Sequence, residues 1–225
     1  MARQIDLLDE GEASFGALRA REKLAAESYR KAADALSSKR QKAATKFARA
    51  VMKELAPLKL DKAQFKVVVE PDPEHPGEDG IDRVAFEVST NPGAPFGALK
   101  QIASGGELSR FVLALKTVLT AKDGRSVIVF DEVDSGVGGA VADAIGERLA
   151  KIASDAQTLV VTHSPQVAAR AGAHFKVEKA GKKMVKTDVR LLTEEERREE
   201  IARMLSGATV TEEARAAATK LLEAA

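Results

Sequence analysis

The chain has 225 residues, of which 44% are hydrophobic, and a formal net charge of +1 at pH 7. This length and composition suit a folded protein of one or two domains and exclude a disordered tail. The sequence contains no cysteine and three histidines, which excludes a disulfide framework, a thiolate-based zinc site and a histidine-rich metal cluster. No run approaches the roughly 20 apolar residues of a membrane span and the chain opens on no secretory signal, so we expect a cytoplasmic protein. The near-neutral charge favours no class of partner, and DNA would have to bind a local basic patch.

A long helical arm is predicted for residues 5–55. The segment lacks proline and is rich in Ala, Leu, Glu, Lys and Arg, which is the composition of a long helix. Its apolar residues recur mostly at steps of three, four or seven, so we expect a coiled-coil arm, with a helix packed on its own domain as the alternative. Pro57 ends the arm and divides the chain into an arm, 1–57, and a second domain, 58–225. A basic run on the arm is typical of a solvated helix face, with DNA contact as the alternative; it consists of Lys39, Arg40, Lys42, Lys46 and Arg49.

After the arm, residues 65–69 and 84–89 are predicted to form an antiparallel pair of strands, joined by the proline- and glycine-rich segment 71–80. The predicted elements that follow are helix 107–119, strand 126–130, helix 139–152, strand 158–162 and a hairpin of strands 175–179 and 184–191 that turns at Gly181. Two apolar strands joined by a helix indicate a βαβ unit in a buried parallel sheet. The predicted fold class is therefore α/β.

Two helices are predicted at the end of the chain, the first beginning near Thr193 and the second near residues 209–211. Each start carries the T-x-x-E pattern of a capping box. The predicted boxes pair Thr193 with Glu196 and Thr209 with Glu212. Between the helices, Gly207 is predicted to be a C-terminal cap.

The first candidate site lies at the start of helix 107–119, in the segment Ala103-Ser104-Gly105-Gly106-Glu107. As a structural feature, Ser104 and Glu107 form a capping box and the glycines permit a tight turn. As a binding site, glycine amides at the positive end of a helix approach a phosphate closely. A glycine pair costs conformational entropy that a cap does not require, so we favour the phosphate contact.

The second candidate site is the end of strand 126–130, where Asp131 and Glu132 follow an apolar run. Open α/β sheets bind ligands at the C-terminal edge of their parallel strands. In nucleoside triphosphatases one acid there organises Mg²⁺ and a second orients and deprotonates the attacking water. The alternative is a solvated strand end. Asp134 follows in a glycine-rich loop.

The third candidate site is the Thr162-His163 pair after the apolar strand 158–162. A lone histidine at a strand end is more often structural than catalytic. In a βαβ unit, however, this edge lies beside Asp131 and Glu132, and an imidazole there can hydrogen-bond a terminal phosphate or the attacking water. The three sites therefore support one another.

The order of these motifs matches the second half of an ABC-type ATPase head. A signature is followed by a strand that ends in Asp-Glu, an Asp-containing loop, and a strand followed by His. In its detail the sequence resembles the RecN family of SMC-like DNA repair ATPases, and the resemblance covers nearly the whole chain. The segments that carry it are 102–110, 130–137, 161–169 and 201–207, together with 35–40 and 91–93.

The resemblance implies the C-terminal lobe of an ABC/SMC-type ATPase head, with an N-terminal coiled-coil helix that is the returning limb of a hairpin. ATP is sandwiched between two such heads. By the same resemblance, Asp131 supports Mg²⁺, Glu132 polarises the attacking water and His163 senses the γ-phosphate. Asp134 communicates across the head dimer. The residues that contact the γ-phosphate of ATP on the opposite head are Ser104, Gly105 and Gly106, with Glu107 completing the motif.

The sequence departs from the family in one respect, because no G-x-x-x-x-G-K-[ST] segment occurs in it. We therefore expect the isolated chain to be inactive and to need an N-terminal P-loop lobe as a partner. The resemblance further implies a head-to-head homodimer, DNA ends or single-stranded regions as a partner, recombinational repair of double-strand breaks, and association with the nucleoid. The alternatives are a half-head of another SMC or Rad50-like ATPase and a partner-binding module that keeps the lobe as a scaffold. An ABC transporter subunit is the weakest alternative.

Overall fold

The computed structural model describes residues 2–102, 105–119, 127–180, 186–207 and 209–225. They form two compact units, described separately below. Unit 1 comprises residues 1–48 and 66–87, and unit 2 comprises residues 49–65 and 88–225. These units group residues by their contacts, so the hairpin 66–87 falls with the helix that it packs on. They do not test the predicted division at position 57 into an arm and a second domain, which stays a prediction.

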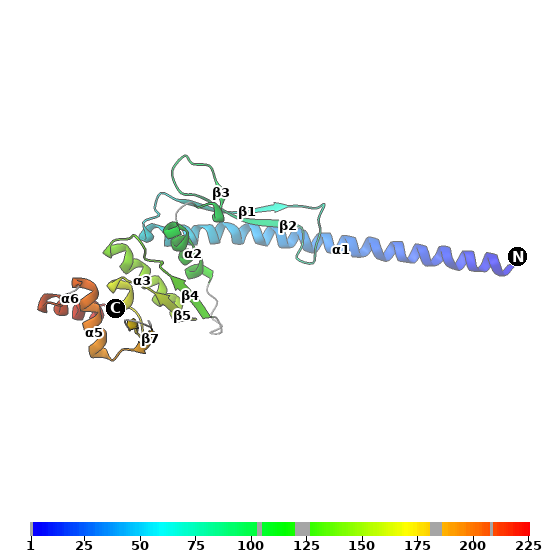
Figure 1. Ribbon diagram of the computed structural model, residues 1–225. Coiled ribbons are helices and arrows are strands. Elements are labelled where there is room, and N and C mark those ends of the chain that lie inside the picture. The colour runs from blue at the N-terminus through cyan, green and yellow to red at the C-terminus, as the bar shows by residue number, and fades with distance from the viewer. Residues whose placement is uncertain (1, 103–104, 120–126, 181–185, 208) are drawn as a thin grey trace. The chain divides into compact units, whose positions relative to one another are not determined.

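The elements appear in the predicted order, and most of them are labelled in Figure 1. They are α1 (Ala2–Leu55), η1 (Ala56–Leu58), β1 (Gln64–Pro71), β2 (Asp82–Ser89), β3 (Gly97–Ala98), η2 (Leu99–Gln101), α2 (Gly105–Leu119), β4 (Val127–Asp131), α3 (Gly139–Ala153), β5 (Gln157–Val161), α4 (Pro165–Ala169), β6 (Phe175–Ala180), β7 (Lys186–Leu191), α5 (Glu194–Ser206) and α6 (Glu212–Glu223). The predicted α/β class and the long N-terminal helix are confirmed. The short elements η1, β3, η2 and α4 were not predicted. None of the described helices is long and apolar enough to cross a membrane.

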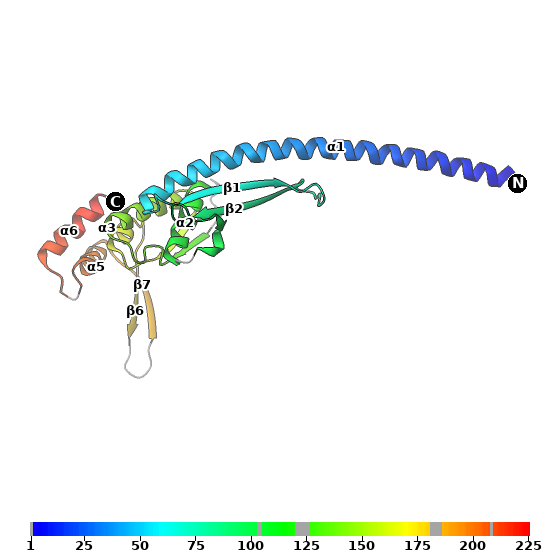
Figure 2. The ribbon, with the colours of Figure 1, turned by 90° about the horizontal axis from the view of Figure 1, so that it is seen from above.

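In unit 1, the hairpin β1–β2 lies along helix α1 in both ribbon views (Figures 1 and 2). The Asp82 carboxylate accepts a hydrogen bond of 2.5 Å from the Ser37 hydroxyl and one of 3.0 Å from Arg40 Nη1. These two bonds, the Ser37 bond foremost, hold the pKa of Asp82 below its usual range. Further along, the rings of Phe47 and Phe86 pack with centroids 5.8 Å apart. The segment 35–40, noted for its resemblance, therefore fastens the hairpin to the helix.

The outer part of α1 has apolar side chains on its surface. Phe15, Leu18 and Leu24 are 69%, 55% and 66% exposed. Such positions are the ones that a second helix covers in a coiled coil. The coiled coil itself stays a prediction.

In unit 2, β4 and β5 pair in parallel, with Val127 opposite Gln157 and Asp131 opposite Val161. Helix α3 joins them, as the predicted βαβ unit requires, and α2 packs against α3. The core on this side is fully buried and contains Phe111, Leu113, Ile145 and Ile152.

The parallel sheet, which was expected to be buried, has one exposed face in the described part of the chain. Side chains alternate along a strand, and only Phe130 and its neighbours on the helix side are covered. Val127, Val129, Leu159 and Val161, on the other face, are between 48% and 62% exposed. The apolar pattern was correct, but the described residues supply a cover for one face only.

The C-terminal part of unit 2 joins the antiparallel hairpin β6–β7 to the helices α5 and α6. In this hairpin Phe175 lies opposite Leu191 and Val177 opposite Val189. The predicted turn at Gly181 lies outside the described residues. Helices α4, α5 and α6 share a small core of Ala168, Ala169, Ile201, Ala202, Ala214 and Ala218.

One of the two predicted capping boxes is confirmed and the other is wrong. Thr193 accepts a hydrogen bond from the amide of Glu196, whose carboxylate accepts one from the amide of Thr193. Helix α6, by contrast, begins directly after Thr211, whose hydroxyl accepts from the amide of Ala214. The third helical position is then an alanine, which has no carboxylate to close a box, so Thr209 does not cap this helix. Gly207 is confirmed as a cap: it has φ of +80° and its amide donates to Arg203.

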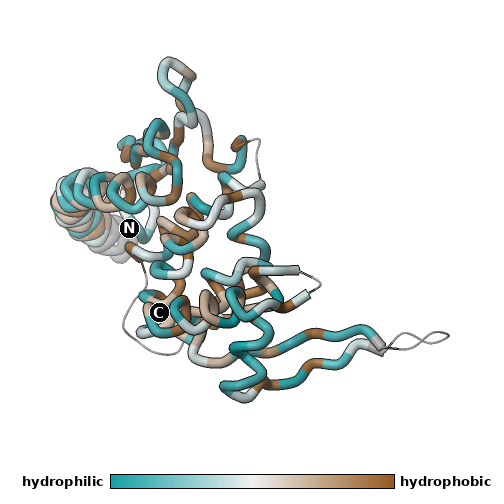
Figure 3. The backbone as a smooth tube through the Cα atoms, turned by 90° about the vertical axis from the view of Figure 1, so that its left-hand side faces the viewer, coloured by the Kyte–Doolittle hydropathy of each residue, from teal (hydrophilic) through white to brown (hydrophobic). Residues whose placement is uncertain are grey.

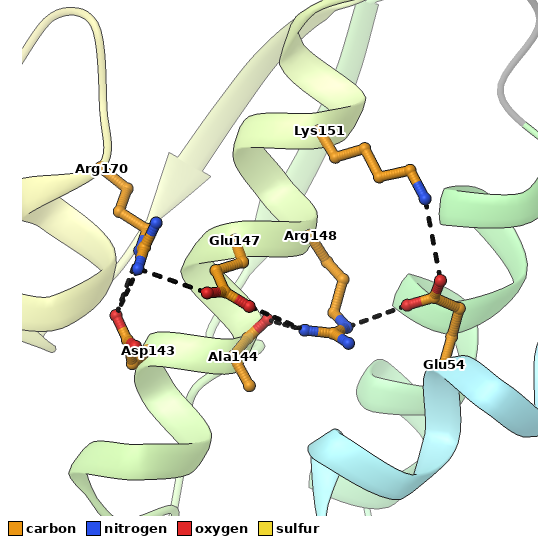
Figure 4. A network of polar contacts seen from close by, with 7 residues as sticks. All are labelled: Glu54, Asp143, Ala144, Glu147, Arg148, Lys151 and Arg170. Atoms are coloured by element: carbon orange, nitrogen blue, oxygen red, sulfur yellow. Dashed lines mark hydrogen bonds and ion pairs between the residues drawn. The ribbon is translucent and has the colours of Figure 1, made fainter. Parts of the chain in front are cut away.

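A chain of ion pairs crosses unit 2 along helix α3 (Figure 4). Arg148 Nε donates to Glu54 Oε2 at 3.0 Å, which ties the end of α1 to α3. Arg170 Nε donates to Asp143 Oδ1 at 3.1 Å, which ties α3 to the residue after α4. Helix α3, which connects β4 to β5, is thereby held at two points along its length.

Candidate nucleotide site

The site is centred on the end of β4, where Asp131 is the last strand residue and Glu132 turns the chain away. Both side chains are exposed. Glu132 has φ of +48°, a left-handed conformation that is unusual for a residue with a side chain and costs on the order of 1 kcal/mol. Two backbone bonds hold it there. The Glu132 amide donates to Val161 at 3.2 Å, and the Ser135 amide donates to Glu132 at 3.0 Å.

His163 reaches the same edge from β5. Because Asp131 lies opposite Val161 in the parallel register, the chain leaves both strands at the same level. His163 follows two residues later and is exposed. The structure thus places Asp131, Glu132 and His163 at one edge of the β4–β5 sheet. These are the three residues for which catalytic or metal-binding roles were predicted. Their roles stay predictions.

Asp134 differs from these three because it is buried, with only 2% of its surface exposed. Its Oδ2 atom accepts a short hydrogen bond from the Thr162 hydroxyl and one of 3.1 Å from the Ser164 amide. Thr162 and Ser164 flank His163, and neither was singled out from the sequence. A threonine and a serine around a histidine gave no signal, because their partner lies 28 and 30 residues earlier.

The predicted phosphate-binding segment begins helix α2. Gly105, Gly106 and Glu107 are its first three residues, so their amides belong to the first turn, where helices leave amides without partners. Ser104 lies outside the described residues, and the choice between cap and phosphate contact stays open there.

The start of α2 is close to the loop that follows β4. A methyl group added at Gly106 would lie 3.4 Å from the carbonyl oxygen of Ser135 and 3.4 Å from Arg110 Nη1. A side chain of more than one carbon at this position would therefore press against the Ser135 carbonyl or the Arg110 guanidinium. Burial lowers the pKa of Arg110, against an opposing effect of Glu107. The first and second candidate sites are therefore neighbours in space.

The carboxylate oxygens at this edge of the sheet suit a hard cation that also binds phosphate. Within the described part of the chain, no group of three or more His, Cys, Asp or Glu side chains is placed to hold a metal ion. Mg²⁺ in nucleotide sites is held by one or two carboxylates together with substrate phosphates and water. The exposed Asp131 carboxylate at the strand end fits that kind of site.

Known proteins resemble this chain in sequence and in fold. No protein-family model matches the chain. Over 220 residues, or 97% of its length, the chain is 44% identical to the DNA repair protein RecN of Rickettsia conorii and 46% identical to that of Rickettsia felis. It spans 40% of the length of each of these relatives.

Among solved structures, the Smc head domain with a coiled coil and joint from Pyrococcus yayanosii is similar, with a TM-score of 0.50 and 18% sequence identity. The match covers 71% of this chain and 29% of that one. The chain therefore has the fold of the C-terminal lobe of an SMC-type head, preceded by a coiled-coil-type helix.

Proposed function

We propose that this chain, a RecN-type sequence over nearly its whole length, forms the C-terminal half of an SMC-like ATPase head that works in the recombinational repair of DNA double-strand breaks. The observation that carries the proposal is the gathering of Asp131, Glu132 and His163 at one strand edge of unit 2. The glycines of α2 lie beside the loop that follows this edge. These are the parts that hydrolysis of a nucleoside triphosphate requires from this side of a site.

In this proposal, bound ATP and Mg²⁺ supply the phosphoryl group to be transferred and the cation that neutralises its charge. Asp131 holds the cation, and Glu132 accepts the proton of the attacking water. His163 donates a hydrogen bond to the terminal phosphate. In a homodimer, the terminal phosphate of ATP held by one head is contacted by the start of helix α2 of the other head. The residues of this contact are Ser104, Gly105, Gly106 and Glu107.

The need for a complementary lobe is supported by apolar surface in unit 2. Val127, Val129, Leu159 and Val161 on the sheet, and Phe175, Val177, Val189 and Leu191 on the hairpin, are all between 48% and 63% exposed. Hydrophobic positions recur along the protruding hairpin in Figure 3. Several exposed apolar side chains on one face of a sheet or hairpin are typical of a binding surface. We assign it to a P-loop-containing N-terminal lobe, without which the chain does not bind ATP productively.

DNA as a partner is supported by the charge of helix α1. Residues 35–53 contain six basic residues and no acidic one. Lys39, Lys42 and Lys46 are exposed and recur at steps of three and four, which places them on one face of the helix. Such a row suits DNA phosphates, and a protein acting on chromosomal DNA would work at the nucleoid.

The DNA contact is tested by replacing Lys39, Lys42 and Lys46 together by Glu, which should weaken DNA binding in a fluorescence anisotropy titration. The control variant replaces Lys59, Lys62 and Lys220 by Glu. It changes the net charge by the same amount and should not weaken DNA binding.

The catalytic assignment is tested by Glu132→Gln. The chain is combined with the part of the Rickettsia conorii relative that lies outside the aligned 220 residues. We expect ATP binding to persist and hydrolysis to slow about 100-fold or more, because the amide keeps the shape of the side chain and cannot take a proton. Hydrolysis at the parental rate would show that Glu132 is a solvated strand end.

A further inference from the structure

Asp134 is a buried carboxylate two residues after the exposed Glu132. It is 2% exposed, and its neighbour Val133 is 1% exposed. Among the described residues, no Lys, Arg or His forms an ion pair with it, and its Oδ1 atom has no hydrogen-bond partner. A buried acid with so few partners costs stability, so general packing does not account for it.

All hydrogen bonds of the Asp134 carboxylate go to the two residues that flank His163. Oδ2 accepts from the Thr162 hydroxyl on one side and from the Ser164 amide, at 3.1 Å, on the other. The Ser164 amide also lies 2.9 Å from Thr162 Oγ1, so the three groups form one closed cluster. We call these three residues the bracket.

The bracket is anchored at both ends. On the β4 side, the Glu132 amide is bonded to Val161 and the Ser135 amide to Glu132. On the β5 side, the Ser164 carbonyl accepts from the amide of Ala168, within the first turn of α4. His163 itself is exposed, and without the bracket its segment would be a short connection free to move.

We propose that Asp134 is a positioning residue that fixes His163 relative to Glu132 within one chain. The predicted role of Asp134 in communication across a head dimer stays a prediction, and the positioning role is separate from it, because it rests on contacts within one chain. The catalytic meaning of the positioning rests on the proposed function. The hydrogen bonds among Asp134, Thr162 and Ser164 do not depend on that function.

The bracket is tested on the 225-residue chain by hydrogen exchange of backbone amides, followed by NMR. In Asp134→Ala the Ser164 amide loses one of its two acceptors and keeps only the Thr162 hydroxyl, which itself loses its own acceptor. Exchange at Ser164 should therefore be up to about tenfold faster, the factor that corresponds to loss of one ordinary hydrogen bond. The Leu149 amide in helix α3 reports on global opening and should not change. Thr162→Val, which keeps the side-chain shape, should also speed exchange at Ser164, and Thr162→Ser, which keeps the hydroxyl, should leave it within about twofold of the parent. Unchanged exchange at Ser164 in both Asp134→Ala and Thr162→Val would overturn the proposal; should Asp134→Ala fail to fold, Thr162→Val decides alone.

A second measurement separates positioning from mere stability. The same variants are combined with the non-aligned part of the Rickettsia conorii relative, and ATP hydrolysis is measured. Thr162→Val should lower kcat about tenfold with an unchanged KM, and Thr162→Ser should restore kcat. An unaltered kcat for Thr162→Val would overturn the positioning role. If the parental combination hydrolyses no ATP, the proposed function fails, while the exchange data still decide whether Asp134 holds the His163 segment.

Discussion

The two long hairpins of the chain differ in which of their faces is covered. In unit 1, β1–β2 is fastened to helix α1 by the Ser37 and Arg40 bonds to Asp82 and by the ring pair of Phe47 with Phe86. In unit 2, β6–β7 is instead fastened by its charged face to α5. Lys176 Nζ lies 3.1 Å from Glu200 Oε2, and Arg190 Nη1 lies 2.6 Å from Glu196 Oε1.

The apolar face of β6–β7 is the one left exposed. Phe175, Val177, Val189 and Leu191 are between 55% and 63% exposed. A two-stranded hairpin is marginal alone in water, and a protein that is complete in itself covers the apolar face first, because that burial stabilises most. The difference teaches that β1–β2 packs against a helix of its own chain, whereas the described residues leave the apolar face of β6–β7 exposed, which is the face that we propose the complementary lobe covers.

The largest effect is expected from charges placed on the exposed hairpin face. Val177→Lys with Val189→Lys should weaken binding of the complementary part of the Rickettsia conorii relative about 100-fold or more, because two ammonium groups would be buried in an apolar contact. The thermal midpoint of the isolated chain should hardly change, since both side chains are already exposed. Isothermal titration and thermal unfolding measure the two quantities. Asp188→Lys, on the opposite face of the hairpin, is the control and should spare binding. Equal binding by the double variant would mean that the exposed face has no partner.

A smaller effect is expected from removing the half-exposed ring that packs hairpin β1–β2 against helix α1. Phe86→Ala removes the packing against Phe47 and should lower the free energy of unfolding by about 1–2 kcal/mol. Val84→Ala, two residues earlier at a position that is 52% exposed, should cost less than about 0.5 kcal/mol. Urea unfolding compares the two. If Val84→Ala cost as much as Phe86→Ala, the ring pair would not be what holds this hairpin.

The smallest effect is a pH dependence of the same hairpin. The folded pKa of Asp82 is lowered, by the Ser37 hydroxyl first and Arg40 second, so its contribution to stability is present above the ordinary pKa and is lost as pH falls below it. The stability advantage of the parent over Asp82→Asn should therefore be constant between about pH 7 and 5 and shrink below about pH 4. Urea midpoints at several pH values measure it. An advantage that grows on acidification would have the wrong sign for this account.

Local patterns were enough to predict the scaffold of the site. Apolar runs that end in Asp131 and His163, with a helix between them, specify a βαβ unit and bring both ends to one edge. Thr193 and Glu196 could be paired from sequence because a capping box spans only three residues. The Thr211 cap was missed because two threonines precede Glu212, and the pattern alone does not say which one the chain turns at.

Features that depend on distant contacts could not be predicted. Asp134 looked like its exposed neighbours Asp131 and Glu132, since its burial depends on Thr162 and Ser164 far along the chain. The sheet was expected to be buried because Val129 and Leu159 are apolar, and apolar character says only that a face seeks a cover. The roles of Ser104 and its neighbours remain predictions.

The central claim is that this chain is half of a nucleotide-binding head. Calorimetric titration of ATP tests it most directly, first into the chain alone and then into the chain combined with the non-aligned part of the Rickettsia conorii relative. We predict no measurable binding by the chain alone, because it has no P-loop to cradle the phosphates, and binding in the micromolar range by the combination. Micromolar binding by the chain alone, or none by the combination, would contradict the claim.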